Sequence, residues 1–325
     1  LPCATTNIIF GNLLYSSCDT TTGDLRDFFL QRLTRLSHVV HIHQRRQRRG
    51  GHPEQVRLGP RGLAPPTLAD LFYADLGHVE TPKVEGKWTV EKALDASPGT
   101  ATPADPNSPL PYFHMIERLK TTKREGWRRF GIERGESIAD HMYRMSLLSM
   151  LAPPALAPRL DLARCMKMCL IHDMAESLVG DITPVDGVPK PEKNRREADT
   201  MDYITKTLLG SVYGGLAGAE IREIWQEYED SETINSHFVH DLDKMELLLQ
   251  MMEYEKRGQG KLDLGEFAYV ATKFSLPETK EWADALLKER EQFWGAQEHV
   301  HGEAGVKGGV KEDRREQQDS YYERK

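Results

Sequence analysis

Apolar residues recur at helical spacing through much of the chain, and this repeat constrains the fold more than any other feature. From residue 112 to about 295 the stripes repeat every three or four positions, and alternating runs typical of strands are few. The stripes are Ile116/Leu119, Met142/Met145/Leu148, Leu162/Cys165/Met168/Cys169/His172 and Leu242/Met245/Leu248/Leu249/Met252. This pattern predicts amphipathic helices, each burying one face. We therefore expect an all-α fold, a helical bundle over residues 112–295.

The composition of the remaining residues divides them into three further segments. Residues 1–95 contain an Arg-rich stretch without sustained periodicity, which predicts a low-complexity, largely disordered extension. Residues 96–111 contain five prolines and are interpreted as an extended linker. Residues 296–325 are rich in glycine and charge, which predicts a disordered tail.

Charge, hydropathy and cysteine content exclude several classes of function. Lys and Arg total 43 against 50 Asp and Glu, so no overall basic field would hold a long nucleic acid. No run of eighteen apolar residues occurs, so we expect no membrane association. Four cysteines do not form a disulfide framework, which favours a reducing compartment. The cytoplasm is the expected location, and the Arg-rich residues 25–49 keep the mitochondrion as the weaker alternative.

A few polar residues within the helical region are candidates for chemistry. Ser137 and Asp140 have the spacing of a capping box, which predicts a helix that carries His141. The adjacent His172-Asp173 pair continues an apolar stripe, and Asp243 lies on another amphipathic stretch. Taken singly, each of these residues also has a structural explanation. His141 can be a core histidine, the His172-Asp173 pair can make a structural hydrogen bond, and Asp243 can be one partner of an ion pair.

Taken together, they resemble the H…HD…D signature of the HD-domain metal-dependent phosphohydrolases, and specifically the 5'-deoxynucleotidase branch. The resemblance covers residues 110–295. The blocks that carry it are Gly126-Trp127, Glu-Ser-Ile-Ala-Asp-His-Met-Tyr-Arg-Met at 136–145, His-Asp-Met-Ala-Glu-Ser-Leu-Val-Gly-Asp-Ile-Thr-Pro at 172–184, and Lys193-Asn194-Arg195-Arg196-Glu197.

The resemblance implies one divalent cation held by two imidazoles and two carboxylates. The implied ligands are His141, His172, Asp173 and Asp243. A mixed nitrogen and oxygen site suits Mn²⁺, Co²⁺ or a similar cation such as Fe²⁺, Ni²⁺ or Zn²⁺. No thiolate is required, which agrees with reading Cys165 and Cys169 as core residues.

The resemblance also implies two catalytic carboxylates, Glu176 and Asp181. In one reading Glu176 orients or deprotonates the attacking water and Asp181 protonates the leaving O5'. In the other, both carboxylates hold a second cation, Mg²⁺, with help from the backbone carbonyl of Ile182. The sequence leaves both readings open. Trp127 is the candidate for substrate binding, because a rigid indole can close a pocket against the 2'-position of the sugar.

The expected function is therefore that of a metal-dependent 5'-deoxynucleotidase. It would hydrolyse 2'-deoxyribonucleoside 5'-monophosphates to a deoxynucleoside and phosphate. Two alternatives remain: an HD-type phosphodiesterase or nucleotide phosphohydrolase with another substrate, and a non-catalytic interaction module that a metal stabilises. The family often forms dimers, so a homodimer is also considered.

Overall fold

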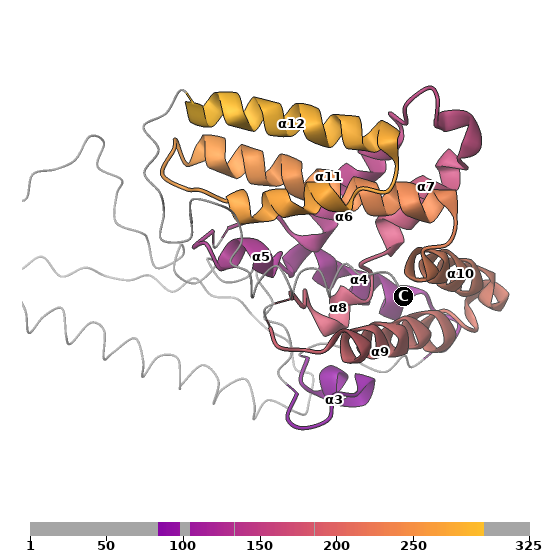
Figure 1. Cartoon of the computed structure of the whole chain (residues 1–325). Helices are drawn as coiled ribbons and strands as arrows, with labels where there is room; N and C mark the ends of the chain where they lie inside the picture. The colour runs from indigo at the N-terminus through magenta and orange to yellow at the C-terminus, as the bar shows by residue number, and fades with distance from the viewer. Residues whose placement is uncertain (1–83, 98–104, 133, 185, 296–325) are drawn as a thin grey trace, which may run out of the picture. The chain divides into compact units, whose positions relative to one another are not determined.

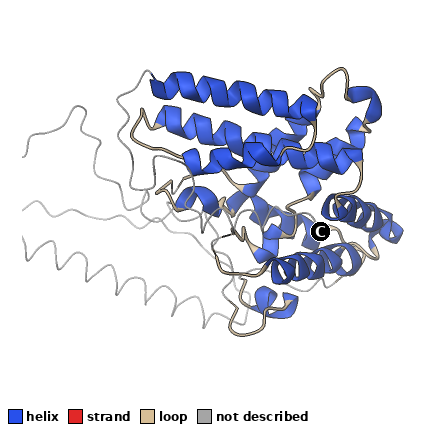
Figure 2. Ribbon diagram, viewed as in Figure 1, coloured by secondary structure: helices blue, strands red, loops and turns tan. Residues whose placement is uncertain are grey.

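The computed structural model describes residues 84–97, 105–132, 134–184 and 186–295, and most of these residues lie in helices (Figures 1 and 2). All of them belong to one compact unit, Pro66–Lys325; the other unit, Leu1–Pro65, lies outside the described residues. The α-helices are α3 (Val90–Asp95), α4 (Leu110–Thr121), α5 (Glu125–Arg128), α6 (Ile138–Ser149), α7 (Leu162–Ile171), α8 (Glu176–Val179), α9 (Lys190–Asp202), α10 (Leu216–Asp230), α11 (Ile234–Arg257) and α12 (Pro277–Gly295). The remaining elements are the 3₁₀-helices η1 (Ala157–Arg159), η3 (Val212–Gly215) and η4 (Gly265–Lys273) and the π-helix η2 (Tyr203–Leu208). The all-α prediction is confirmed.

Side-chain caps explain where the central helices begin. The hydroxyl of Ser137 accepts a hydrogen bond from the Asp140 amide, and the Asp140 carboxylate accepts one from the Ser137 amide. The predicted capping box is therefore present at the start of α6. A second box, formed by Thr233 and Ser236, starts α11. Each box satisfies amide groups that the first helical turn leaves without intrahelical partners.

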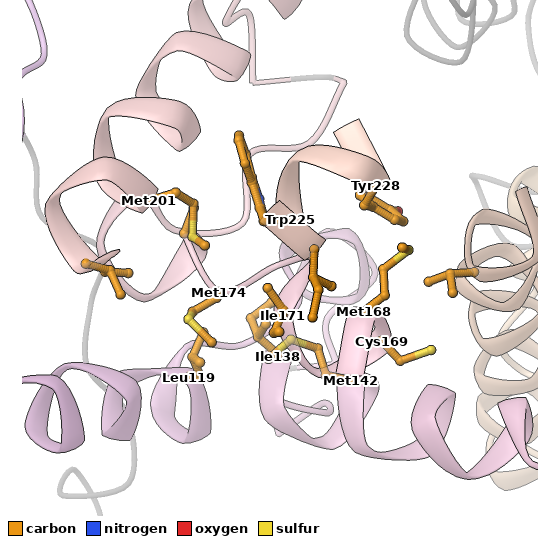
Figure 3. Packing of buried hydrophobic residues seen from close by; sticks show 14 of the residues in the cluster. Leu119, Ile138, Met142, Met168, Cys169, Ile171, Met174, Met201, Trp225 and Tyr228 are labelled. Carbon is orange, nitrogen blue, oxygen red and sulfur yellow. The ribbon is translucent and has the colours of Figure 1, made fainter. Parts of the chain in front are cut away.

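The main core lies where α6, α7 and α11 pack together and α4, α8, α9 and α10 cover them. Figure 3 shows part of this cluster, including Ile138 of α6, Met168 and Cys169 of α7 and Trp225 of α10. Both Cys165 and Cys169 are buried free thiols within it, as expected for core residues.

A second core cluster joins α11 to η4 and α12, which run beside it in Figure 1. It contains Trp127, Leu248, Met252 and Phe267. A buried carboxylate also holds α12 in place, because Glu255 accepts hydrogen bonds from the Arg290 guanidinium at 2.8 Å.

The helical unit begins earlier than the sequence suggested. We assigned residues 1–95 to a largely disordered extension, yet residues 84–97 include α3 and pack on the main core. Trp88, Val90 and Ala93 are buried there, and Arg195 donates a hydrogen bond to the Trp88 carbonyl at 3.0 Å. The structure therefore groups this short segment with the bundle. Residues 1–83, residues 98–104 of the predicted linker and the predicted tail 296–325 lie outside the described residues.

None of the helices in the described ranges combines the length and the apolar character needed to cross a bilayer.

Candidate metal centre

Two buried histidines from neighbouring helices form the base of the site. His141 lies in α6 and His172 caps the C-terminus of α7, with their ring centroids 5.5 Å apart. The Nδ1 atom of His141 lies 2.6 Å from Glu246 Oε2, and that of His172 lies 3.0 Å from the Cys169 carbonyl oxygen. The Nε2 atoms of both rings are buried and make no hydrogen bond to any residue that the structure describes. A neutral imidazole whose Nδ1 donates a proton has its lone pair on Nε2, available to a metal.

Two carboxylates lie beside these unpaired nitrogens. Asp173 Oδ2 is 3.3 Å from His172 Nε2 and 3.8 Å from His141 Nε2. Asp243 Oδ1 is 3.2 Å from His141 Nε2, close but outside hydrogen-bond geometry. Ligand atoms on one cation lie about 3 Å apart when each bond is near 2.1 Å. His141, His172 and Asp173 thus form a group whose ligand atoms lie within reach of one cation, and Asp243 adjoins it through His141 Nε2; the donor set fits a divalent cation.

The guanidinium of Arg124 spans the two aspartates. Its Nη1 is 3.3 Å from Asp173 Oδ2, and its Nη2 is 3.9 Å from Asp243 Oδ1. Two backbone hydrogen bonds hold this segment next to the start of α6: Arg124 N–H to the Glu136 carbonyl at 3.2 Å, and Ile138 N–H to the Thr122 carbonyl at 3.0 Å. The residue pattern alone does not distinguish Arg124 from the neighbouring Arg128 and Arg129.

Electrostatics keep the two aspartates ionised despite burial. Burial alone would raise the pKa of Asp173 and of Asp243, but the nearby histidines and Arg124 hold both pKa values below the ordinary range. Burial and Arg124 lower the pKa of His141, yet the charge of Glu246 and the side-chain contacts with Asp243 and Glu246 outweigh them and raise it to about 10, so a cation that binds Nε2 displaces a proton. The site therefore concentrates negative charge that attracts a cation.

Glu176 and Asp181 flank the same site. Glu176 begins α8, is 2% exposed, and its Oε2 has no hydrogen-bond partner. Burial and the charges of Asp173 and Asp181 hold the pKa of Glu176 well above its ordinary value. Asp181 follows Gly180, whose positive φ of 80° ends α8, and its Oδ2 accepts a hydrogen bond from the Glu125 amide at 2.7 Å.

The turn between α7 and α8 explains how Asp173 and Glu176 reach the site. His172 and Glu176 do not share one continuous helix, because α7 ends at Ile171 and α8 begins at Glu176. Hydrogen bonds of three-residue span, such as Glu176 N–H to the Asp173 carbonyl at 3.0 Å, tighten the backbone between them.

A cavity of about 1130 Å³ opens beside these residues. Its lining includes His172, Asp173, Glu176, Asp181, Ile182 and Asp243. The basic side chains along its walls are Arg124, Arg129, Lys190, Lys193, Lys244 and Lys273. The cleft therefore brings an acidic cation site together with lysine and arginine side chains that can contact a phosphate ester.

Trp127 lies in the wall of this cleft but is mostly enclosed. Its indole is 1% exposed and packs against Phe267, at 4.6 Å between ring centroids, and Tyr254, at 5.3 Å. Its Nε1 donates a hydrogen bond to Glu136 Oε1 at 2.7 Å. The predicted contact with the sugar would therefore act through the shape of the wall, because little indole surface is open.

Two residues outside the predicted set are prominent at the site, Arg124 and Glu246. Glu246 is three residues after Asp243, so helical spacing places both on one face of α11, and this was the available signal for it. Two histidines close to Asp243 on α11 contact backbone carbonyls instead: His237 Nε2 lies 2.8 Å from the Ser231 oxygen, and His240 Nε2 3.0 Å from the Tyr228 oxygen.

Comparison with known families agrees with this geometry. The family model described as "HD domain" matches residues 116–281, just over half of the chain. The chain therefore belongs to the HD-domain family.

Three curated relatives give a narrower grouping. The 5'-deoxynucleotidase hdd1 of Schizosaccharomyces pombe is 45% identical over 187 residues, covering 58% of this chain and 92% of the relative. The 5'-deoxynucleotidase YGK1 of Saccharomyces cerevisiae is 40% identical over 189 residues, covering 58% and 86%. The 5'-deoxynucleotidase HDDC2 of Homo sapiens is 38% identical over 182 residues, covering 56% and 85%.

Proposed function

We propose that this chain is a metal-dependent 5'-deoxynucleotidase that hydrolyses 2'-deoxyribonucleoside 5'-monophosphates to a deoxynucleoside and phosphate. The observation that carries the proposal is the pair of buried Nε2 atoms of His141 and His172, which have no hydrogen-bond partner among the described residues and lie beside two carboxylates in a cleft that also holds lysine and arginine side chains. The relatives that match the helical region are named 5'-deoxynucleotidases, which narrows the substrate class.

His141, His172, Asp173 and Asp243 would hold the cation, for which we propose Mn²⁺ or Co²⁺. Such a cation, when bound, lowers the pKa of a coordinated water and neutralises charge on phosphoryl oxygens. Arg124 lies between two of these ligands and can contact a phosphate oxygen from the open side. Lys193 and Lys244 line the same cleft and add positive charge for the substrate.

Glu176 is placed to accept the proton of the attacking water, because its Oε2 is buried and has no partner within the described residues. Asp181 is fixed by the Glu125 amide and would deliver a proton to the departing O5'. In the alternative arrangement these two carboxylates and the Ile182 carbonyl hold a second cation, Mg²⁺. A cation stoichiometry of one or two per chain separates the two arrangements.

A homodimer is the assembly we propose. Tyr143 and Leu147 of α6 and Leu151 just beyond it are 63%, 46% and 70% exposed, and their spacing places them along one side of the helix. Exposed apolar stripes of this kind mark association surfaces. Sedimentation of the wild type and of a Leu147→Glu/Leu151→Glu variant tests this proposal, and a monomeric wild type would contradict it.

The proposed compartment is the cytoplasm, supported by the buried free thiols of Cys165 and Cys169. Fractionation of cells that produce the tagged protein tests this, and enrichment in mitochondria would favour the weaker alternative.

The activity is tested by phosphate release from 5'-deoxynucleoside monophosphates, their ribo- and 3'-counterparts, and a diester, with Mn²⁺, Co²⁺ or Mg²⁺. We expect release from the 5'-deoxy substrates, and its loss in a His172→Ala/Asp173→Ala variant. Substitution of the exposed His114 by alanine is the matched control and should leave the rate unchanged. Turnover of the diester alone would indicate a phosphodiesterase, and cation binding without any turnover would indicate a non-catalytic module.

A further inference from the structure

We propose that Glu246 is a positioning residue that fixes the proton of His141 on Nδ1 and thereby raises the affinity of the site for its cation. The inference rests on the proposed function only in taking His141 as a ligand. It concerns cation binding, which is measurable without any substrate.

The contact between Glu246 and His141 is short and fully enclosed. Glu246 Oε2 lies 2.6 Å from His141 Nδ1, and both side chains are 0% exposed. An ionised carboxylate can only accept a hydrogen bond, so Nδ1 carries a proton, and it is Nε2 that gives up its proton and offers its lone pair when a cation binds. Arg144 Nε donates to the other oxygen of Glu246 at 2.8 Å and stabilises the ionised form of this carboxylate.

Arg144 holds this carboxylate in place from the other side. Its Nε donates to Glu246 Oε1 at 2.8 Å, its Nη2 to Gln250 Oε1 at 2.9 Å, and its Nη1 to Glu253 Oε2 at 2.8 Å. Each oxygen of Glu246 therefore has a different donor. The arginine fixes the rotation of the carboxylate and so directs Oε2 at the imidazole.

The two histidines of the site differ in this respect. The Nδ1 atom of His172 donates to a neutral acceptor, the Cys169 carbonyl, at 3.0 Å. A buried carboxylate makes the imidazole it contacts a more basic ligand than a carbonyl does. His141 is therefore the ligand whose donor strength depends on a side chain and can be altered by substitution.

Glu136, His141 and Glu246 also form a close acidic group, which raises the question of a separate cation there. The 2.6 Å contact between Nδ1 and Oε2 is a direct hydrogen bond and leaves no space for an ion between the two atoms. Glu136 Oε1 is in turn occupied by the Trp127 indole. The group therefore acts on the site through His141.

Replacement of Glu246 by glutamine tests the proton position at constant side-chain shape. The amide offers one acceptor and one donor where Arg144 and His141 need two acceptors. If its oxygen faces Arg144, its NH₂ faces Nδ1 and drives the proton to Nε2, where it blocks the cation. If its oxygen faces His141, its NH₂ opposes the arginine, and the carboxylate's charge is lost in either case.

The experiment is a Co²⁺ titration of the full chain with a competing chelator, combined with the visible d–d spectrum. We expect Glu246→Gln to weaken Co²⁺ binding by about 10- to 100-fold and to shift the d–d bands. Glu253→Gln is the matched control, since the same arginine contacts both carboxylates but Glu253 is 40% exposed and belongs to the outer end of the network. It should bind Co²⁺ within about twofold of the wild type. A folded Glu246→Gln chain with wild-type affinity and spectrum would overturn the proposal.

A second variant covers the case in which Glu246→Gln does not fold. Glu246→Asp keeps the negative charge, but its side chain is one methylene shorter, so the carboxylate lies farther from His141. We therefore expect a Co²⁺ affinity between those of the wild type and the glutamine variant. Wild-type affinity in this variant would also overturn the proposal. If the wild type hydrolyses no nucleotide and Glu246→Gln still weakens Co²⁺ binding, the inference is supported and the proposed function is contradicted. The two proposals can therefore fail separately.

Discussion

Asp241 and Asp243 lie two residues apart on α11, and their carboxylates contact different parts of the molecule. Asp243 lies beside His141 Nε2 at 3.2 Å, whereas Asp241 accepts hydrogen bonds from the amides of Ser275 and Leu276, at 2.8 and 2.9 Å, and from the Thr279 hydroxyl at 2.7 Å. One aspartate belongs to the metal centre, and the other anchors the start of α12. Within one turn of α11, one face therefore contributes to cation binding and the other to the stability of the fold.

Asparagine substitutions at these two positions should have distinct effects. Asp241→Asn should lower the free energy of unfolding by about 2 to 3 kcal/mol, because buried donors lose an acceptor. Asp243→Asn should change it by less than about 1 kcal/mol while weakening Co²⁺ binding at least tenfold. Urea unfolding of the metal-free proteins and Co²⁺ titration check both. Equal loss of stability in the two variants would contradict the division of roles.

Removal of the Arg124 charge should affect cation and substrate in opposite directions. Arg124→Met leaves the two aspartates without their nearby positive charge, so Co²⁺ affinity should rise by up to about tenfold at low ionic strength. The KM for a 5'-deoxynucleotide should rise by about tenfold, because a phosphate contact is lost. Arg128→Met is the control, since Arg128 pairs with Glu125 and both are about one-third exposed. A parallel loss of both affinities would show that Arg124 only supports the fold.

Glu176→Gln should separate catalysis from folding. We expect kcat to fall by about 10²- to 10³-fold, because a proton acceptor is lost. The unfolding free energy should be equal to or higher than that of the wild type, because burial and the charges of Asp173 and Asp181 disfavour ionisation of Glu176, and glutamine cannot ionise. The comparison variant is Glu197→Gln in the same cleft, where the carboxylate pairs with Lys193 at 3.2 Å and a smaller effect on kcat is expected. If Glu176→Gln instead reduces the cation stoichiometry from two to one, the second-cation arrangement is correct.

Glu229 should make stability depend on pH. Burial and the charge of Glu197 raise the pKa of Glu229 to about 7, so ionisation is disfavoured in the folded chain. Its contribution to stability is complete below the unfolded pKa of about 4.3 and is lost as the pH rises through 7. Glu229→Gln should therefore gain about 1 kcal/mol relative to the wild type between pH 5 and pH 8, an amount reduced by solvent screening at this half-buried position. Chemical unfolding of both proteins at the two pH values measures it, and a constant difference would contradict the assignment.

Local sequence signals predicted much of the fold. The helical period indicated the all-α class, and Ser137 and Asp140 marked the start of α6. The gathering of His141, His172, Asp173 and Asp243 came from the family resemblance, since periodicity places residues on a face but does not say which faces meet.

The features that the sequence did not predict depend on contacts between distant residues. His141 and Glu246 are 105 positions apart, and Arg124 and Asp173 are 49 apart, so neither pair leaves a local pattern. The six-residue α3 is too short to show periodicity. No glycine or proline marks the turn between α7 and α8.

The most direct test of the central claim is removal and return of the cation. The protein is stripped with a chelator, dialysed, and assayed for phosphate release from a 5'-deoxynucleoside monophosphate before and after addition of Mn²⁺ or Co²⁺, beside His172→Ala. The account predicts no activity after stripping, recovery that saturates with bound cation in the wild type, and no recovery in the variant. Undiminished phosphate release from the fully stripped wild type, or full recovery in His172→Ala, would contradict it.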